Sequence, residues 1–271
     1  MYALLKNFSK LPLRFIQNLA KSVGSLLYIT NSSIRRTTEI NLGIAYPELS
    51  ASERTRLAKR SVQSQCMTYA ESVKIWGSEP EFALKQIRNI HHPEIFTDAL
   101  KNPNGTLAVV PHFGTWELLN AWVNQHTSPV IMYKPSKNPD VDRFMLEARQ
   151  RLNATLVPTD ETGVRALFKH LKQGGFAAIL PDHVPKESGG IYSPFYGQNA
   201  LSSTLLSKLA AKTQCSVIGL SCLRHDDLNG FDIHVTELST DILSKDLQLS
   251  VDTLNKEMER MINIAPEQYL W

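Results

Sequence analysis

Short apolar runs alternate with amphipathic stretches through the middle of the chain. The runs are rich in Val, Ile, Leu and Ala and are bounded by Gly, Pro or polar residues, which is typical of buried strands. We expect such strands at 106–110, 130–133, 154–157 and 176–180. Between them, apolar positions recur at helical spacing over 116–125, 140–152 and 163–172. Strands that alternate with helices predict an α/β fold with a mostly parallel, helix-covered sheet.

The last part of the chain continues this pattern. Two apolar stretches, 216–224 and 231–238, flank the turn residues 226–230 and predict a β-hairpin. A helix over 247–264 is expected to close the chain. No linker rich in Pro, Gly or Ser divides these elements, so we expect a single α/β domain over 31–271.

A helical region is expected before this domain. Ser50 and Glu53 have the spacing of a capping box, which marks a helix start. An apolar stripe then leads toward Trp76 through Leu57, Val62, Cys66 and Tyr69.

An amphipathic segment lies at 11–30, within an N-terminal region that we take as 1–30. Arg14 and Lys21 would each cost roughly 2.5–3.5 kcal/mol at the centre of a bilayer, so a spanning helix is not expected. No small-x-small cleavage site indicates a signal peptide. Two interpretations stay open: a helix packed on the domain, or an interfacial membrane helix. The apolar positions are Leu11, Phe15, Ile16, Leu19, Ala20, Val23, Leu26 and Leu27.

Charge is distributed unevenly along the chain. Residues 1–60 hold 10 Lys/Arg against 3 Asp/Glu, whereas the whole chain has a net charge of only +3. A basic first segment before a mildly acidic body predicts contact with an anionic partner. Nucleic acid is disfavoured because no basic cluster is interleaved with aromatic residues. The three cysteines show no C-x-x-C pair, which favours a reducing compartment over a disulfide framework.

Candidate chemistry lies where two predicted strands end. His112 and Asp182 each follow a Pro at such an end, and ligands of open α/β sheets bind beyond the carboxyl ends of strands. Glu117 stands five residues after His112. Residues five apart on one helix point about 140° apart, so His112 must precede the helix, with Gly114 permitting the turn. Glu117 can then accept a hydrogen bond from one ring nitrogen and leave the other to take a proton. The alternative is a strand-end histidine that only caps the helix.

Several sequence blocks together resemble the late lipid A acyltransferases (lauroyl and myristoyl transferases) and their relatives acting on other glycolipids. The blocks follow one another in the order and spacing of that family and span most of the chain. They are NLGIAYPELSASER (41–54), AESVKIW (70–76), HFGTWE (112–117), MYKPSKNPDVD (132–142), LPDHVPKESGGIYSPFYG (180–197) and APEQYLW (265–271).

The resemblance implies a membrane-associated α/β acyltransferase at the cytoplasmic face of the inner membrane, bound peripherally or weakly anchored. Its donor would be an acyl carrier protein or coenzyme A thioester, and its acceptor a hydroxyl of a membrane glycolipid such as a lipid A precursor. No metal and no cofactor are expected. His112 corresponds to the general base and Glu117 to its orienting partner. Lys134, Arg149 and Asp182 correspond to substrate-binding positions, although Lys134 replaces an arginine and offers a point charge instead of a bidentate grip.

Two other functions are compatible with a histidine at this position. A lipid or thioester hydrolase would use the same histidine with water, and a non-catalytic lipid-binding protein could keep the fold. No G-x-S-x-G motif supports a covalent acyl-enzyme. His183 stands where the family commonly has glutamine. Structural roles are expected for the remaining candidates, His91, His92, His225 and His234.

Overall fold

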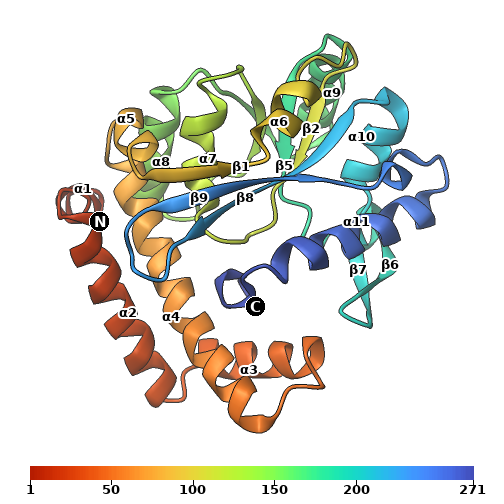
Figure 1. Cartoon of the computed structure of the whole chain (residues 1–271). Helices are drawn as coiled ribbons and strands as arrows, with labels where there is room; N and C mark the ends of the chain where they lie inside the picture. Colours follow the sequence, from red (N-terminus) through yellow and green to blue (C-terminus); the bar gives the residue numbers. More distant parts are fainter.

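The computed structural model describes all residues from 1 to 271 and is built around one seven-stranded sheet (Figure 1). The strand order is β1-β9-β8-β2-β5-β3-β4, and only the β8–β9 pair is antiparallel. The predicted mostly parallel sheet is confirmed, and the predicted strands lie in place to within one residue at either end. The strands are β1 (Ile87–His91), β2 (Thr106–Val109), β3 (Val130–Tyr133), β4 (Thr155–Pro158), β5 (Phe176–Ile179), β8 (Ser216–Arg224) and β9 (Phe231–Glu237).

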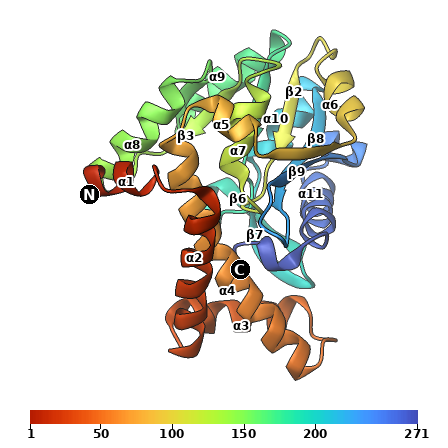
Figure 2. The same cartoon turned by 60° about the vertical axis from the view of Figure 1, so that its left-hand side comes forward.

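Helices cover both faces of this sheet (Figures 1 and 2). Alternate residues of β2 show the division, because Leu107 and Val109 belong to one buried cluster and Ala108 to the other. The Ala108 side is covered by α6 (Pro93–Ala99) and α7 (Trp116–Val123). The Leu107 side is covered by α9 (Glu161–Lys172), α10 (Leu205–Thr213) and α11 (Leu247–Ile262). Two further helices are α5 (Pro80–Leu84) and α8 (Pro139–Gln150).

A second, two-stranded sheet packs on α11. It consists of β6 (Gly190–Phe195) and β7 (Gln198–Ser203), an antiparallel hairpin that the sequence analysis did not place. Its two-residue turn, Tyr196–Gly197, has positive φ at both positions, 47° and 73°. That geometry is a type I′ turn, whose twist matches the flanking strands. Short 3₁₀ segments complete the chain: η1 (Glu187–Gly189), η2 (Thr240–Leu243) and η3 (Pro266–Gln268).

Besides α5, four helices precede the first strand of the sheet. They are α1 (Tyr2–Phe8), α2 (Leu13–Ile29), α3 (Ser33–Ala45) and α4 (Ala51–Trp76). The predicted capping box at the start of α4 is present, with both of its hydrogen bonds between Ser50 and Glu53. In both views α2 runs alongside α4 (Figures 1 and 2). No helix combines the length and the apolar character needed to cross a bilayer.

The apolar stripe of α2 is divided between two surroundings. Ile16 and Ala20 are buried, and at Gly24 the backbones approach so closely that a Cβ would lie 2.6 Å from Cα of Gln63 on α4. Leu19 and Leu26, by contrast, remain 45% and 60% exposed. Phe15, Val23 and Ile29 are exposed as well. One side of α2 therefore packs on the protein while another apolar side faces outward.

A buried ionic network ties these helices to the sheet. Glu71 of α4 accepts two hydrogen bonds from Arg224 of β8, at 2.5 and 2.8 Å, and neither side chain is more than 3% exposed. Gln17 of α2 donates to the same carboxylate at 2.7 Å, and the Thr115 hydroxyl donates to it at 2.6 Å. Glu71 thus joins the N-terminal helices, the sheet and the loop before α7.

Candidate active site

A partly apolar cavity of about 530 Å³ opens at the carboxyl ends of β2 and β5. More than half of its lining residues are hydrophobic, and the ionisable ones gather among them. The cavity therefore combines an apolar slot with a few polar groups, which is the usual composition of a small-molecule site. Its ionisable lining residues are His112, Glu117, Lys134, Arg149 and His183.

His112 lies in the loop between β2 and α7, as its spacing from Glu117 predicts, and it is held by Asp182. Its ring Nδ1 lies 2.8 Å from Oδ1 of Asp182, and its backbone N–H donates to Oδ2 at 2.7 Å. Because an ionised carboxylate can only accept, the proton is on Nδ1 and Nε2 is left to take another. The Asp182 side chain is 3% exposed. The arrangement fixes both the tautomer and the direction of the ring.

Gly114 makes the turn that brings His112 to this position. Its φ is +65°, and a Cβ there would lie 2.1 Å from the carbonyl oxygen of Cys222. The next residue, Thr115, donates its backbone N–H to that carbonyl at 2.7 Å. Only glycine fits both the left-handed conformation and the close approach to β8.

The C-terminal segment supports the same loop. Gly114 donates to the carbonyl of Gln268 at 2.9 Å, and Leu270 donates to the carbonyl of His112 at 3.2 Å. Between them, Tyr269 lies beside Asp182. Burial, followed by the charge of Asp182 and a hydrogen bond to it, raises the pKa of Tyr269 well above its usual range. The phenol therefore stays protonated. Nothing in the sequence indicated that Tyr269 contacts Asp182, except that Tyr269 belongs to the APEQYLW block.

Glu117 has other partners than the His112 ring. It accepts hydrogen bonds from Trp76 Nε1 at 2.9 Å and from Asn120 at 3.2 Å, and it pairs with the Arg149 guanidinium at 3.4 Å. The hydrogen bond to the imidazole that the sequence analysis expected from Glu117 is made by Asp182. The physical reason is topological: β2 and β5 are adjacent, whereas Glu117 in the first turn of α7 faces α4 and α8.

Arg149 of α8 is fixed by Glu117 and by an aromatic ring. The Arg149 guanidinium lies 5.4 Å from the centroid of Tyr133, and its side chain is 13% exposed. Its Nε atom is buried without a hydrogen-bond partner, which leaves a donor of this guanidinium unused. Lys134 is exposed and lines the same cavity. The structure thus brings His112, Glu117, Lys134 and Arg149 to one cavity, and Asp182 behind it.

Sequence comparison with known proteins identifies the family of this chain. The sequence model of the bacterial lipid A biosynthesis acyltransferase family matches residues 1–271. The chain belongs to this family. It is similar to a lipid A biosynthesis lauroyltransferase of Escherichia coli, with 25% identity over all of this chain and 83% of that protein. A palmitoleoyltransferase of E. coli is 23% identical over 85% of this chain and 74% of its own length. A myristoyltransferase of E. coli is 22% identical over 96% and 80%. The protein is accordingly an acyltransferase of lipid A biosynthesis.

His183 is a second imidazole of this acyltransferase's cavity. Its ring centroid lies 4.2 Å from that of His112. Burial lowers the pKa of His183, and the neighbouring His112 lowers it further. Both effects favour a neutral His183 ring beside His112.

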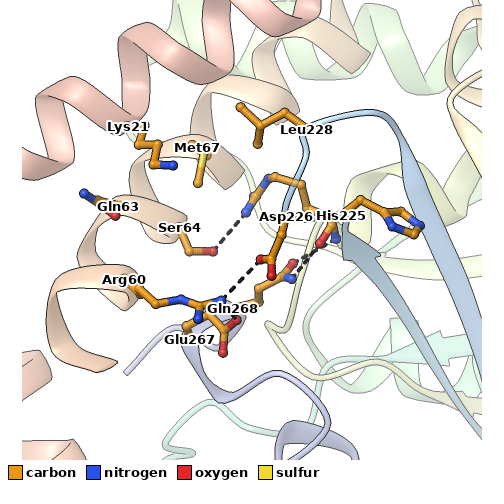
Figure 3. Close-up of a pocket in the computed structure, with 11 residues that line it drawn as sticks. Lys21, Arg60, Gln63, Ser64, Met67, His225, Asp226, Leu228, Glu267 and Gln268 are labelled. Carbon is orange, nitrogen blue, oxygen red and sulfur yellow. Dashed lines mark hydrogen bonds and ion pairs between the residues drawn. The ribbon is translucent and has the colours of Figure 1, made fainter. Parts of the chain in front are cut away.

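A second cavity, of about 290 Å³, lies between the N-terminal helices and the C-terminal segment (Figure 3). Its lining is mostly polar, and Arg60 bridges Asp226 at 3.2 Å and Glu267 at 2.6 Å across it. Only two lining residues are hydrophobic. Such a lining does not suit a hydrocarbon chain.

Proposed function

We propose that this acyltransferase moves a fatty acyl chain from an acyl carrier protein or coenzyme A thioester to a hydroxyl of a membrane glycolipid such as a lipid A precursor. The observation that carries the proposal is the oriented His112 at an apolar cavity. The names of the similar lauroyl-, palmitoleoyl- and myristoyltransferases support the substrate class. Each CH₂ group buried in the slot contributes about 0.8 kcal/mol to binding.

His112 acts as the general base in this proposal. Its Nε2 takes the proton of the acceptor hydroxyl, the oxygen attacks the thioester carbonyl, and the donor thiolate leaves and recovers the proton. An ester and a free thiol result. Asp182 holds the ring and stabilises the imidazolium that forms, in the way that a triad aspartate does. The positive end of α7, which begins at Trp116, favours the developing oxyanion.

Arg149 and Lys134 hold anionic groups of the substrates in the same proposal. Both line the cavity that contains His112, and guanidinium and ammonium groups bind phosphates through charge-assisted hydrogen bonds. Glu117 orients the Arg149 guanidinium toward the substrate, because the two side chains form an ion pair at 3.4 Å.

The test of the proposed function is product analysis by mass spectrometry. The full chain is incubated with acyl carrier protein and coenzyme A thioesters, with and without a lipid A precursor. We expect an acylated glycolipid that forms only with the acceptor. Release of free fatty acid at the same rate without acceptor would identify a hydrolase and overturn the transfer step.

We also propose that the region 1–30 binds the anionic cytoplasmic face of the inner membrane. The outward side of α2 carries Phe15, Leu19, Val23, Leu26 and Ile29, all exposed, next to a basic first segment. An apolar face combined with nearby Lys and Arg residues is the pattern of an interfacial helix.

Removing apolar groups from this face is expected to weaken binding to vesicles of phosphatidylethanolamine and phosphatidylglycerol. The double variant Leu19→Ser/Leu26→Ser removes exposed side chains only, so the fold should persist. Co-sedimentation should fall several-fold, and wild-type binding should weaken with salt, since each basic residue near the surface contributes about 1 kcal/mol.

A matched control is the double variant Leu249→Ser/Ile264→Ser, whose residues are 44% and 51% exposed far along the chain. The control should bind as wild type does. Equal binding by both double variants would contradict a role for α2.

A further inference from the structure

One edge of the seven-stranded sheet carries a cluster of imidazoles around a single carboxylate. His91 of the edge strand β1 is the register partner of His234 on β9. Asp232 stands two residues before His234, so both side chains are on the same face of β9. His225, directly after β8, reaches the same carboxylate. None of these residues lines the cavity around His112.

The two oxygens of Asp232 have different partners. His91 Nε2 lies 2.9 Å from Oδ2, whereas Oδ1 is held by His225 Nε2 at 2.6 Å and by Asn89 at 3.0 Å. The Asp232 side chain is only 13% exposed. The His234 ring stacks on the His91 ring with centroids 4.3 Å apart, and it makes no hydrogen bond. Asn89 and His225 thus fix Oδ1 of Asp232, while Oδ2 faces the imidazoles of His91 and His234.

We propose that His91, Asp232 and His234 bind a divalent transition-metal ion of the zinc class. Two imidazoles and one carboxylate are a donor set that suits Zn²⁺ and similar ions and not Mg²⁺, which prefers oxygen ligands. The three ligand atoms lie within 4.8 Å of one another. Ligands at about 2.1 Å from a tetrahedral ion are about 3.4 Å apart, so rotations of the side chains close the site.

The residues behind the carboxylate strengthen this assignment. Ligating carboxylates in metal sites are themselves hydrogen-bonded, and those outer partners orient the ligand. Asn89 and His225 have this position on Oδ1 of Asp232. Figure 3 shows His225 at the edge of the polar cavity with its ring directed away from Arg60 and Glu267. A bound ion would join the edge strand β1 to β9 and stabilise the fold by mass action.

The test is Zn²⁺ titration of the full chain without a polyhistidine tag, by calorimetry and by the rise in Tm over the value in EDTA. We expect one equivalent of Zn²⁺ to bind and to raise Tm, and Mg²⁺ to do neither. His234→Ala should weaken Zn²⁺ binding by more than about 100-fold. His225→Ala should weaken it by about 10–100-fold, as removal of an outer partner does.

His92→Asn is the matched control. His92 is the sequence neighbour of His91, is 70% exposed, and contacts Glu94 instead of Asp232. Its φ of 57° is one that asparagine tolerates. The control should bind Zn²⁺ as wild type does, and each variant is compared with its own Tm in EDTA. Equal affinities for His234→Ala and wild type, or equal losses in His234→Ala and His92→Asn, would overturn the site. The titration measures metal binding and not acyl transfer, so failure of the metal site and failure of the proposed function are distinguishable.

Discussion

Replacing His112 with alanine is expected to lower kcat by about 10²–10⁴-fold, the usual contribution of a general base. The substitution removes a hydrogen bond to the Asp182 carboxylate, at about 1.5–3 kcal/mol for a bond to a charged group. Activity is therefore compared per folded molecule, with Tm measured beside kcat in detergent or vesicles.

Two conservative variants separate the roles of the carboxylates. Asp182→Asn keeps the shape but removes the charge that holds Nδ1–H of His112, so kcat should fall. Glu117→Gln weakens the ion pair with Arg149, so KM for the anionic substrate should rise more than kcat falls. A larger kcat effect for Glu117→Gln than for Asp182→Asn would restore Glu117 as the partner of the base.

His183→Gln is a matched control for the loss of an imidazole in the same cavity. Its ring lies beside that of His112 but makes no hydrogen bond to Asp182. Its effect on kcat should be much smaller than that of His112→Ala.

The prediction for His112 is contradicted if His112→Ala keeps more than about a tenth of the wild-type kcat, because that loss is smaller than the smallest one expected for a general base. That result would remove His112 from the mechanism.

The sheet was predictable because its central strands are short, continuous apolar runs. β2 and β5 are buried along nearly their whole length, so apolar residues occupy almost every position. β1 gave no such signal, because Ile87–His91 is an edge strand with two exposed polar residues at its centre. The β6–β7 hairpin was missed for a similar reason, since its residues are mostly exposed or half-buried and form no continuous apolar run.

The site was predictable as far as local sequence and topology go. Ends of parallel strands meet at one edge, so His112 and Asp182 were both placed at the rim. Their pairing depends on the adjacency of β2 and β5, which are 70 residues apart at these positions. The sequence analysis favoured Glu117 as the partner of His112 because the two residues are only five positions apart in the chain. Contacts of Tyr269 with Asp182, and of His91 with Asp232, are likewise long-range.

Replacing Glu71 with alanine is expected to destabilise the fold by about 3–5 kcal/mol, because the substitution leaves the buried Arg224 guanidinium without its counter-charge. Gln17 and Thr115 lose an acceptor in the same step. The free energy of unfolding from urea titration measures the effect. The double variant Glu71→Leu/Arg224→Met removes both charges together and should recover part of the loss, since well-packed apolar residues can replace a buried pair.

Glu161→Ala is the matched control for this loss. Glu161 pairs with Arg165 at 3.4 Å, and both side chains are almost fully exposed. An exposed pair contributes about 0–1 kcal/mol, so this variant should unfold nearly as wild type does. A comparable loss in the two single variants would show that Glu71 has no special structural role. The predicted difference follows from burial, because only the inner pair has no water to replace the missing partner.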